Sequence, residues 1–293
     1  MSRVEVLKTY KLFIGGQFPR TESGRYYKLM NKKQDVLANM CLSSRKDVRN
    51  AVTAARKAQE GWSGKSAYNR SQILYRIAEM LEGRKAQFIE ELVLQGESPK
   101  QAQTEVAMSI DRCIYYSGWC DKFQAWSSSV NPVSSSHFNF SVPEPMGVVV
   151  CIAPEHSGLL GLLSVILPAI TGGNTVVVLA SEHKPLSAIT LAEVLATSDL
   201  PGGVINILTG KTSELVEHMA SHMDVNAIIY ARTDATEWQQ IAYLSSLNVK
   251  RSFHWKENWF TSAAQNPYLI MDTQEVKTTW HPIEQIGVSG IKY

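Results

Sequence analysis

The sequence has few of the features that identify a function class directly, and cysteine is the first of these. Its 293 residues include four cysteines, and the spacing of Cys41, Cys113, Cys120 and Cys151 matches no zinc-binding pattern. No secretory signal precedes them, so we expect reduced and mostly buried thiols in a cytoplasmic protein. No metal centre is expected.

Charge of one sign and long hydrophobic runs are also scarce. The net charge is +2, and basic and acidic residues are interleaved without a basic stripe, which argues against nucleic acid as a partner. The most apolar stretch, residues 159–170, contains Pro168 and is shorter than the roughly 20 residues that span a bilayer. We therefore expect a soluble protein with no membrane partner.

The first region, residues 1–126, is expected to open with a strand and turn and to continue as helices. Residues 11–18 form a short apolar run that turns at Gly15-Gly16. Apolar residues then recur at helical spacing over three stretches, 46–60, 67–95 and about 100–126. Capping residues before the first stretch and Gly96 after the second are typical helix boundaries.

Residues 127–145 differ in character from the helices before them. Two serine triplets flank Pro132, and residues His137–Val142 alternate between polar and apolar. This pattern predicts a hairpin that projects from the body of the protein, with an ordinary exposed loop as the alternative.

From Gly147 onward, strand patterns and helix patterns alternate. Strand-like runs occur at 147–153, 175–180, 204–208, 227–230 and 249–255, and helical patterns separate them at 159–171, 186–198, 213–221 and 235–246. Such alternation indicates βαβ units and a parallel sheet with helices on both faces. The predicted fold is therefore α/β, with a doubly wound Rossmann-like core over residues 146–260 and a C-terminal tail over 261–293.

Several short motifs, in this order, resemble the cofactor-binding core of the aldehyde dehydrogenase superfamily. They cover about residues 11–255 and include Glu144-Pro145-Met146-Gly147-Val148-Val149, Ile152-Ala153-Pro154, Gly173-Asn174-Thr175-Val176-Val177 and Leu200-Pro201-Gly202-Gly203-Val204-Ile205-Asn206-Ile207. Residues Glu275–Trp280 look like the C-terminal strand of these enzymes, or else form a generic amphipathic strand. About twenty residues separate that strand from the Rossmann-like core, so the resemblance implies that the catalytic domain is missing. A truncated unit of this kind resembles the C-terminal unit of the family-16 aldehyde dehydrogenases, which carry two such units in tandem.

The resemblance implies chemistry that this sequence does not support. Aldehyde oxidation in the family needs a cysteine thiolate, an amide that stabilises the oxyanion, and a general base. The last cysteine here is Cys151, in a strand expected to be buried, whereas the family's nucleophile lies further downstream. His156 stands at the family's amide position, and Trp255 stands where its base-bearing segment begins. We therefore expect no catalytic residues.

The cofactor-binding positions implied by the resemblance are also altered. Leu179 replaces the lysine that contacts the adenine ribose, and Arg232 and Glu237 replace glycines that let the backbone approach the pyrophosphate. Pro154 and Glu182 are the remaining vestigial candidates; Glu182 either accepts a bond from a ribose hydroxyl or is a solvated loop acid. As an alternative to blocking the pyrophosphate site, Arg232 would itself bind an anionic ligand. We expect no cofactor, with NAD or NADP as the only candidates.

Three functions stay open at this point. The first is a non-catalytic unit, or pseudoenzyme, with a structural or assembly role. By resemblance, Ser134–Val142 and Val276–Pro282 would then extend the sheet of a partner, either a catalytic aldehyde dehydrogenase unit or a second copy. The second is an NAD(P)-dependent oxidoreductase of aldehydes, active only within a longer chain or complex. The third is a non-redox binding module that uses the cleft around His156, Glu182 and Arg232.

Overall fold

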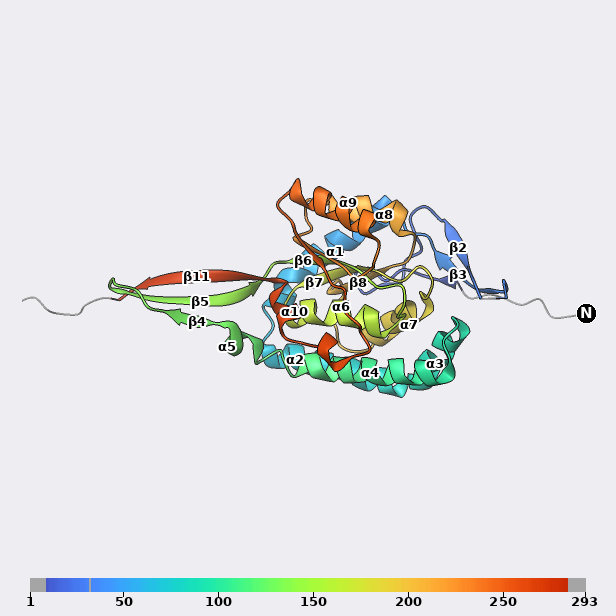
Figure 1. Ribbon diagram of the computed structural model, residues 1–293, viewed down its shortest axis with the longest axis horizontal. Coiled ribbons are helices and arrows are strands. Elements are labelled where there is room, and N and C mark those ends of the chain that lie inside the picture. Colours follow the sequence, from blue (N-terminus) through green and yellow to red (C-terminus); the bar gives the residue numbers. More distant parts are fainter. Residues whose placement is uncertain (1–8, 32, 284–293) are drawn as a thin grey trace, which may run out of the picture.

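The computed structural model describes residues 9–31 and 33–283, and its centre is a five-stranded parallel sheet (Figure 1). The strands are β6 (Val148–Ile152), β7 (Thr175–Leu179), β8 (Ile205–Leu208), β9 (Ala227–Tyr230) and β10 (Arg251–His254). Their order is β10-β9-β6-β7-β8, so the chain leaves β6 in one direction for β7 and β8 and later returns to its other side for β9 and β10. The predicted doubly wound α/β fold is confirmed.

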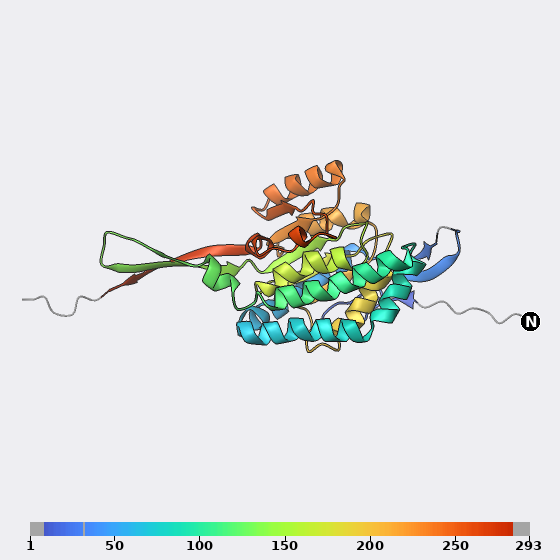
Figure 2. The same cartoon turned by 60° about the horizontal axis from the view of Figure 1, so that its bottom comes forward.

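Helices cover both faces of this sheet (Figures 1 and 2). One face carries α1 (Arg45–Ser63), α8 (Thr212–Ala220) and α9 (Ala235–Ser246). The other carries α6 (Leu160–Thr171) and α7 (Leu186–Leu195), with α4 (Pro99–Ser117) packed over α6. Every residue of α6 is buried, because the helix lies between the sheet and α4. Helices on both faces also explain why β6 and β7 are apolar at successive positions.

The N-terminal region departs from the sequence prediction in two respects. The helix expected over residues 67–95 is two helices, α2 (Ala67–Gly83) and α3 (Lys85–Leu94), because Arg84 has a non-helical backbone. The helix expected to reach residue 126 ends at Ser117, and a short α5 (Phe123–Ser127) follows. The prediction also missed a small sheet of β1 (Thr9–Tyr10), β2 (Tyr26–Met30) and β3 (Val36–Cys41), in the order β1-β3-β2.

The glycine turn at Gly15-Gly16 joins this region to the main sheet. Phe13 exchanges backbone hydrogen bonds of 3.0 and 2.7 Å with Ile207 at the edge of β8. Gly16 has a φ of +78°, and a Cβ atom there would lie 2.9 Å from the Cα atom of Gly202. The turn therefore requires glycine both for its left-handed backbone and for this close approach.

The predicted hairpin is confirmed and the loop alternative is wrong. Strands β4 (Ser129–Asn131) and β5 (His137–Pro145) pair antiparallel, and the C-terminal strand β11 (Gln274–Pro282) pairs along all nine residues of β5. Both views show that this three-stranded sheet projects away from the rest of the protein (Figures 1 and 2). The predicted C-terminal strand thus joins the hairpin of its own chain.

A return segment, residues 255–273, connects β10 to β11 and includes α10 (Tyr268–Met271) and a turn of 3-10 helix at Ser262–Ala264. Its anchor is Arg112 on α4, whose guanidinium is almost completely buried. This group donates to the Trp259 carbonyl at 3.0 Å, to the Ala264 carbonyl at 3.3 Å, to the Gln265 side chain at 3.1 Å and to Ser164 Oγ at 2.6 Å. One arginine therefore fixes the path that leads to the projecting sheet.

Two further expectations concern cysteines and membranes. All four cysteines are buried and none forms a disulfide, as predicted. Within residues 9–31 and 33–283, no helix is long and apolar enough to cross a bilayer.

Replacing Arg112 tests its anchoring role. We expect Arg112→Ala to lower the free energy of unfolding by roughly 3 kcal/mol, because buried acceptors lose a charged donor. Urea denaturation measures the change. Arg76→Ala is the matched control, since Arg76 forms an exposed ion pair with Glu79 and should cost less than about 1 kcal/mol. Equal losses in the two variants would contradict the anchoring role.

Candidate functional site

The candidate site lies at the carboxyl ends of β6 and β9. Because the chain runs from β6 to opposite sides of the sheet, this is the topological switch point, where open α/β sheets bind their ligands. A cavity of about 320 Å³ remains there. It is lined by Glu155, His156, Ala231, Arg232, Thr233, Asp234 and Glu237.

Arg232 occupies the centre of this cleft. The residue lies two positions after the end of β9 and is 9% exposed. Its Nε donates to the carbonyl of Ala153 beyond β6 at 2.9 Å, and its Nη2 donates to the carbonyl of Ala180 beyond β7 at 3.3 Å. The guanidinium thus binds the carboxyl ends of two neighbouring strands and fills the space between them.

Two glutamates neutralise this buried guanidinium. Glu155 Oε1 lies 2.7 Å from Nη2 of Arg232, and Glu182 Oε1 lies 3.3 Å from Nη1. Glu155 also accepts from the Ser181 hydroxyl at 2.7 Å and from the backbone N–H of Glu182 at 3.0 Å. The alternative expectation was that Arg232 binds an anion. In this structure its anionic partners are the carboxylates of Glu155 and Glu182.

Glu182 is not the solvated loop acid that was one of its two interpretations. Its carboxylate accepts from the backbone N–H of Thr212 at 2.6 Å and from the Thr212 hydroxyl at 2.5 Å. Burial alone raises the pKa of Glu182, but the two Thr212 bonds and Arg232 outweigh it and hold the pKa below its usual value of 4.5. Its other interpretation, as an acceptor for a ribose hydroxyl, stays a prediction.

Carboxylates also occupy the helix N-termini that face this edge of the sheet. Glu182 caps α8 through Thr212, and Asp234 accepts from the first-turn N–H groups of α9 at 2.8 and 3.0 Å. The fully buried Glu105 of α4 accepts from the N–H groups of Leu159 and Leu160 at the start of α6, at 2.9 and 3.1 Å. Helix N-termini are the usual binding sites for phosphate in this fold class. Here three of them already hold an anionic side chain.

The positions examined for catalysis are separated rather than assembled. Cys151 is fully buried within β6, and burial raises the pKa of its thiol strongly. The His156 side chain is exposed in the loop after β6. The protein still removes part of the solvent around its ring, and this partial desolvation, together with the nearby charge of Lys184, lowers the pKa of the ring. Trp255 is buried and donates to Asp272 at 2.9 Å. No pair of these side chains is joined by a hydrogen bond in the described part of the chain.

The remaining candidate cofactor positions are buried or hydrogen-bonded within the protein. Leu179 ends β7 with no solvent exposure, and Pro154 is buried two residues after the end of β6. Glu237 accepts a hydrogen bond of 2.8 Å from the Tyr230 hydroxyl. Beside this pair, the rings of Tyr230, Trp238 and His254 contact one another. Sequence reasoning missed Glu155, Glu105 and Asp234, although acidic residues just after a buried strand were a visible signal for two of them.

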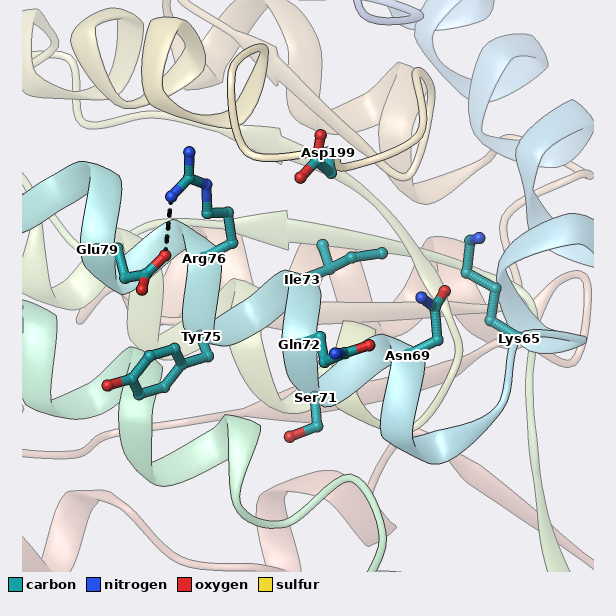
Figure 3. Close-up of a pocket in the computed structure, with 9 residues that line it drawn as sticks. All are labelled: Lys65, Asn69, Ser71, Gln72, Ile73, Tyr75, Arg76, Glu79 and Asp199. Atoms are coloured by element: carbon teal, nitrogen blue, oxygen red, sulfur yellow. Dashed lines mark hydrogen bonds and ion pairs between the residues drawn. The ribbon is translucent and has the colours of Figure 1, made fainter.

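A second, more open cavity of about 710 Å³ lies on the outer side of α2 (Figure 3). Lys65, Asn69, Gln72 and Arg76 line it from the helix side, and Asp199 faces them from the loop after α7. It contains neither a cysteine nor a histidine. Across residues 9–31 and 33–283, no cluster of three or more His, Cys, Asp and Glu side chains is placed to hold a metal ion.

The pH dependence of stability tests the Glu182 contacts. Because folding lowers the pKa of Glu182, its contribution is present above about pH 4.5 and is lost as the pH falls through the folded-state value. We expect Glu182→Gln to be less stable than the parent at pH 7 and the difference to shrink below pH 4.5, as measured by urea denaturation. Glu79→Gln, at an exposed ion pair, is the control. A difference that stays constant from pH 7 to pH 3 would contradict this role.

Comparison with known proteins identifies relatives of the chain. Residues 19–252 match the model of the aldehyde dehydrogenase family. The chain is 32% identical over 249 residues to the putative aldehyde dehydrogenase DhaS of Bacillus subtilis, covering 83% of this chain and 49% of that protein. It is also 32% identical over 234 residues to the cytosolic 10-formyltetrahydrofolate dehydrogenase of Mus musculus, covering 78% and 26%.

Solved structures give the same result. The aldehyde dehydrogenase from Bacillus cereus, in its NAD+ complex, is 25% identical with a TM-score of 0.80, covering 84% of this chain and 50% of that one. PnpE from Pseudomonas sp. WBC-3, in complex with nicotinamide adenine dinucleotide, is 27% identical with a TM-score of 0.80, covering 83% and 50%. The chain thus spans about half the length of these structures and of DhaS, and about a quarter of the formyltetrahydrofolate dehydrogenase. With a family match over most of its sequence and this shared fold, the chain belongs to the aldehyde dehydrogenase family.

Proposed function

We propose that this chain is a non-catalytic aldehyde dehydrogenase-like unit that acts in assembly in the cytoplasm, pairing with a catalytic aldehyde dehydrogenase unit. It would correspond to the truncated C-terminal unit of the family-16 enzymes. The observation that carries the proposal is the ion-pair network of Arg232, Glu155 and Glu182, which occupies part of the cleft and lines what remains of it with charged side chains.

The charges in the cleft argue against a dinucleotide. Four carboxylates, those of Glu155, Glu182, Asp234 and Glu237, lie around the single guanidinium of Arg232. A pyrophosphate would meet these negative charges and would find the N-termini of α6, α8 and α9 already capped. Each loss of about 1.4 kcal/mol in binding free energy weakens the affinity tenfold, so the loss of a few favourable phosphate contacts would abolish dinucleotide binding at physiological concentrations.

The thiol chemistry also argues against catalysis by this chain. A thiolate is the nucleophile in the family reaction, and no cysteine follows Cys151 in the sequence. Burial raises the pKa of the Cys151 thiol, and the residue has no solvent exposure. All four cysteines of this chain are buried, so it offers no accessible thiolate to add to an aldehyde.

The projecting sheet supports the assembly role. Strand β11 is paired with β5 on one edge, and β11 has no second neighbour among the described residues. Val276 and Trp280 on β11 are 64% and 57% exposed, and Phe138 on β5 is 44% exposed. A nine-residue edge strand with exposed apolar side chains is suited to main-chain pairing with another sheet.

An aromatic row continues this surface onto the body of the protein. Tyr115, Trp119, Trp126 and Tyr268 contact one another in series, with ring centroids 5.0 to 6.2 Å apart. Trp126 and Tyr268 are 45% and 66% exposed at the base of the projecting sheet. Tryptophan and tyrosine often contribute the largest share of binding energy at protein interfaces.

Calorimetry with NAD and NADP at millimolar concentration tests the loss of the cofactor site. We expect no binding heat and no aldehyde-dependent formation of NADH, because Arg232 occupies part of the cleft and carboxylates surround it. Binding at micromolar concentration would sink this proposal and favour the alternative, an NAD(P)-dependent oxidoreductase of aldehydes that is active only within a longer chain or complex.

Substitution on the exposed strand tests the assembly role. Sedimentation velocity of the chain mixed with each catalytic aldehyde dehydrogenase of its source organism should reveal a mixed complex. We expect Val276→Lys with Trp280→Lys to abolish it, because charges on an edge strand oppose pairing. Tyr75→Lys, at an exposed aromatic residue on α2, is the control and should leave the complex intact. A chain that associates only with itself, or with none of these enzymes, would overturn the pairing proposed here.

A further inference from the structure

A basic pocket lies between the first turns of α1 and the end of α8, on a different part of the molecule from the cleft. Its volume is about 300 Å³. It is lined by Arg45, Val48, Arg49, His218, Ser221, His222 and Met223. No carboxylate is among these residues, and the two arginines and two histidines carry N–H hydrogen-bond donors.

Arg45 and Arg49 belong to a minority of arginines that have no partner among the described residues. Most arginines in the described residues bind a carboxylate, a carbonyl or an amide oxygen, as Arg25, Arg84 and Arg251 do. Arg45 and Arg49 have no such partner in residues 9–31 and 33–283 and are both exposed. They lie four residues apart on α1, so their like charges face each other at a small cost to the helix. A bound anion would remove that repulsion.

The electrostatic field of the two helix ends beside the pocket does not oppose an anion. Arg45 is the first residue of α1, so the partial positive charge of the helix N-terminus lies beside the pocket. The carbonyls at the end of α8 would oppose an anion, but Lys250 binds two of these groups, Ala220 O at 2.7 Å and His222 O at 2.9 Å. Lys250 is 7% exposed, so its ammonium offsets the negative helix end from within the protein.

Three acidic residues adjoin pocket residues in sequence, Asp47, Glu217 and Asp224, and the charge of Asp224 acts on the His222 ring. Asp47 lies between the two arginines on α1, but its carboxylate accepts from Thr21, Ser44 and the backbone N–H of Glu22. His222 contributes a donor even when its ring is neutral, because Nδ1 accepts from the backbone N–H of Asp224 and leaves the proton on Nε2.

We propose that this pocket binds the phosphate group of a small phosphomonoester. Two guanidinium groups and two imidazoles can surround the three terminal oxygens of such a group, and arginine binds phosphate in a bidentate manner. The Ser221 hydroxyl is not counted among the donors, because it already donates to the Glu217 carbonyl at 2.7 Å. The pocket is large enough for the phosphate and a few attached carbon atoms. The inference is independent of the cofactor cleft and of the assembly role.

Titration with inorganic phosphate and with glycerol 3-phosphate, at constant ionic strength, tests the proposal. The imidazole proton signals of His218 and His222, assigned with His218→Gln and His222→Gln, should shift and saturate. Arg45→Gln with Arg49→Gln should weaken binding by at least about tenfold, since two charge-assisted contacts are removed. The single variants guard against misfolding of the double variant and should each show a smaller loss.

Arg20→Gln is the matched control, because Arg20 is also exposed and unpaired but does not line the pocket. It should bind phosphate as the parent does. Three results would overturn the proposal: no saturable shift, equal weakening by Arg20→Gln and by the arginine pair, or binding to phosphatidic acid vesicles without binding to glycerol 3-phosphate.

Discussion

The buried guanidinium of Arg232 is the interaction on which the carboxyl ends of the central strands depend. Parallel strands end with free carbonyls and helix N–H groups that a bound ligand or solvent must satisfy. In this chain the protein satisfies them itself: Arg232 binds carbonyls beyond β6 and β7, and Glu155 and Glu182 bind the loop and helix that follow β7 and β8. Burial of a single arginine is tolerable because both carboxylates share the same site.

A second arginine has a comparable role on the face of the sheet that α6 and α4 cover. Arg112 holds the return segment against α4 and α6, and Trp259 and Ile270 are buried beneath it. The return segment packs against α4 and α6 and connects β10 to β11 within residues 255–273. The described region thus forms a closed core, with its C-terminal strand integrated into the hairpin sheet, although it spans only about half of the solved structures it resembles.

Much of the architecture was predictable because it depends on local patterns. Apolar runs such as Val148–Val150 and the intervening helical periodicities determine a parallel sheet almost independently of context. The small sheet of β2 and β3 was missed because polar and apolar residues are mixed in both short strands without a clear alternation. The split between α2 and α3 depends on the backbone at Arg84, which periodicity does not reveal.

The cleft was predictable only in part, for a related reason. Alignment of motifs indicated that Arg232 and Glu237 replace glycines, but the partners of Arg232 lie 50 and 77 residues away in sequence. Glu105 reaches the start of α6 from a helix more than fifty residues earlier. Such contacts depend on tertiary geometry, which a single sequence does not encode in any local pattern.

The two roles of Glu182 make the charges of the cleft depend on one another. Its carboxylate both caps α8 and balances Arg232, so replacing Arg232 by glycine alone would leave Glu155 and Glu182 facing each other with no cation between them. Replacing the acidic residues alone would leave the buried guanidinium short of counter-charge. An open, uncharged cleft is therefore reached without an unpaired charge only when all three side chains change together.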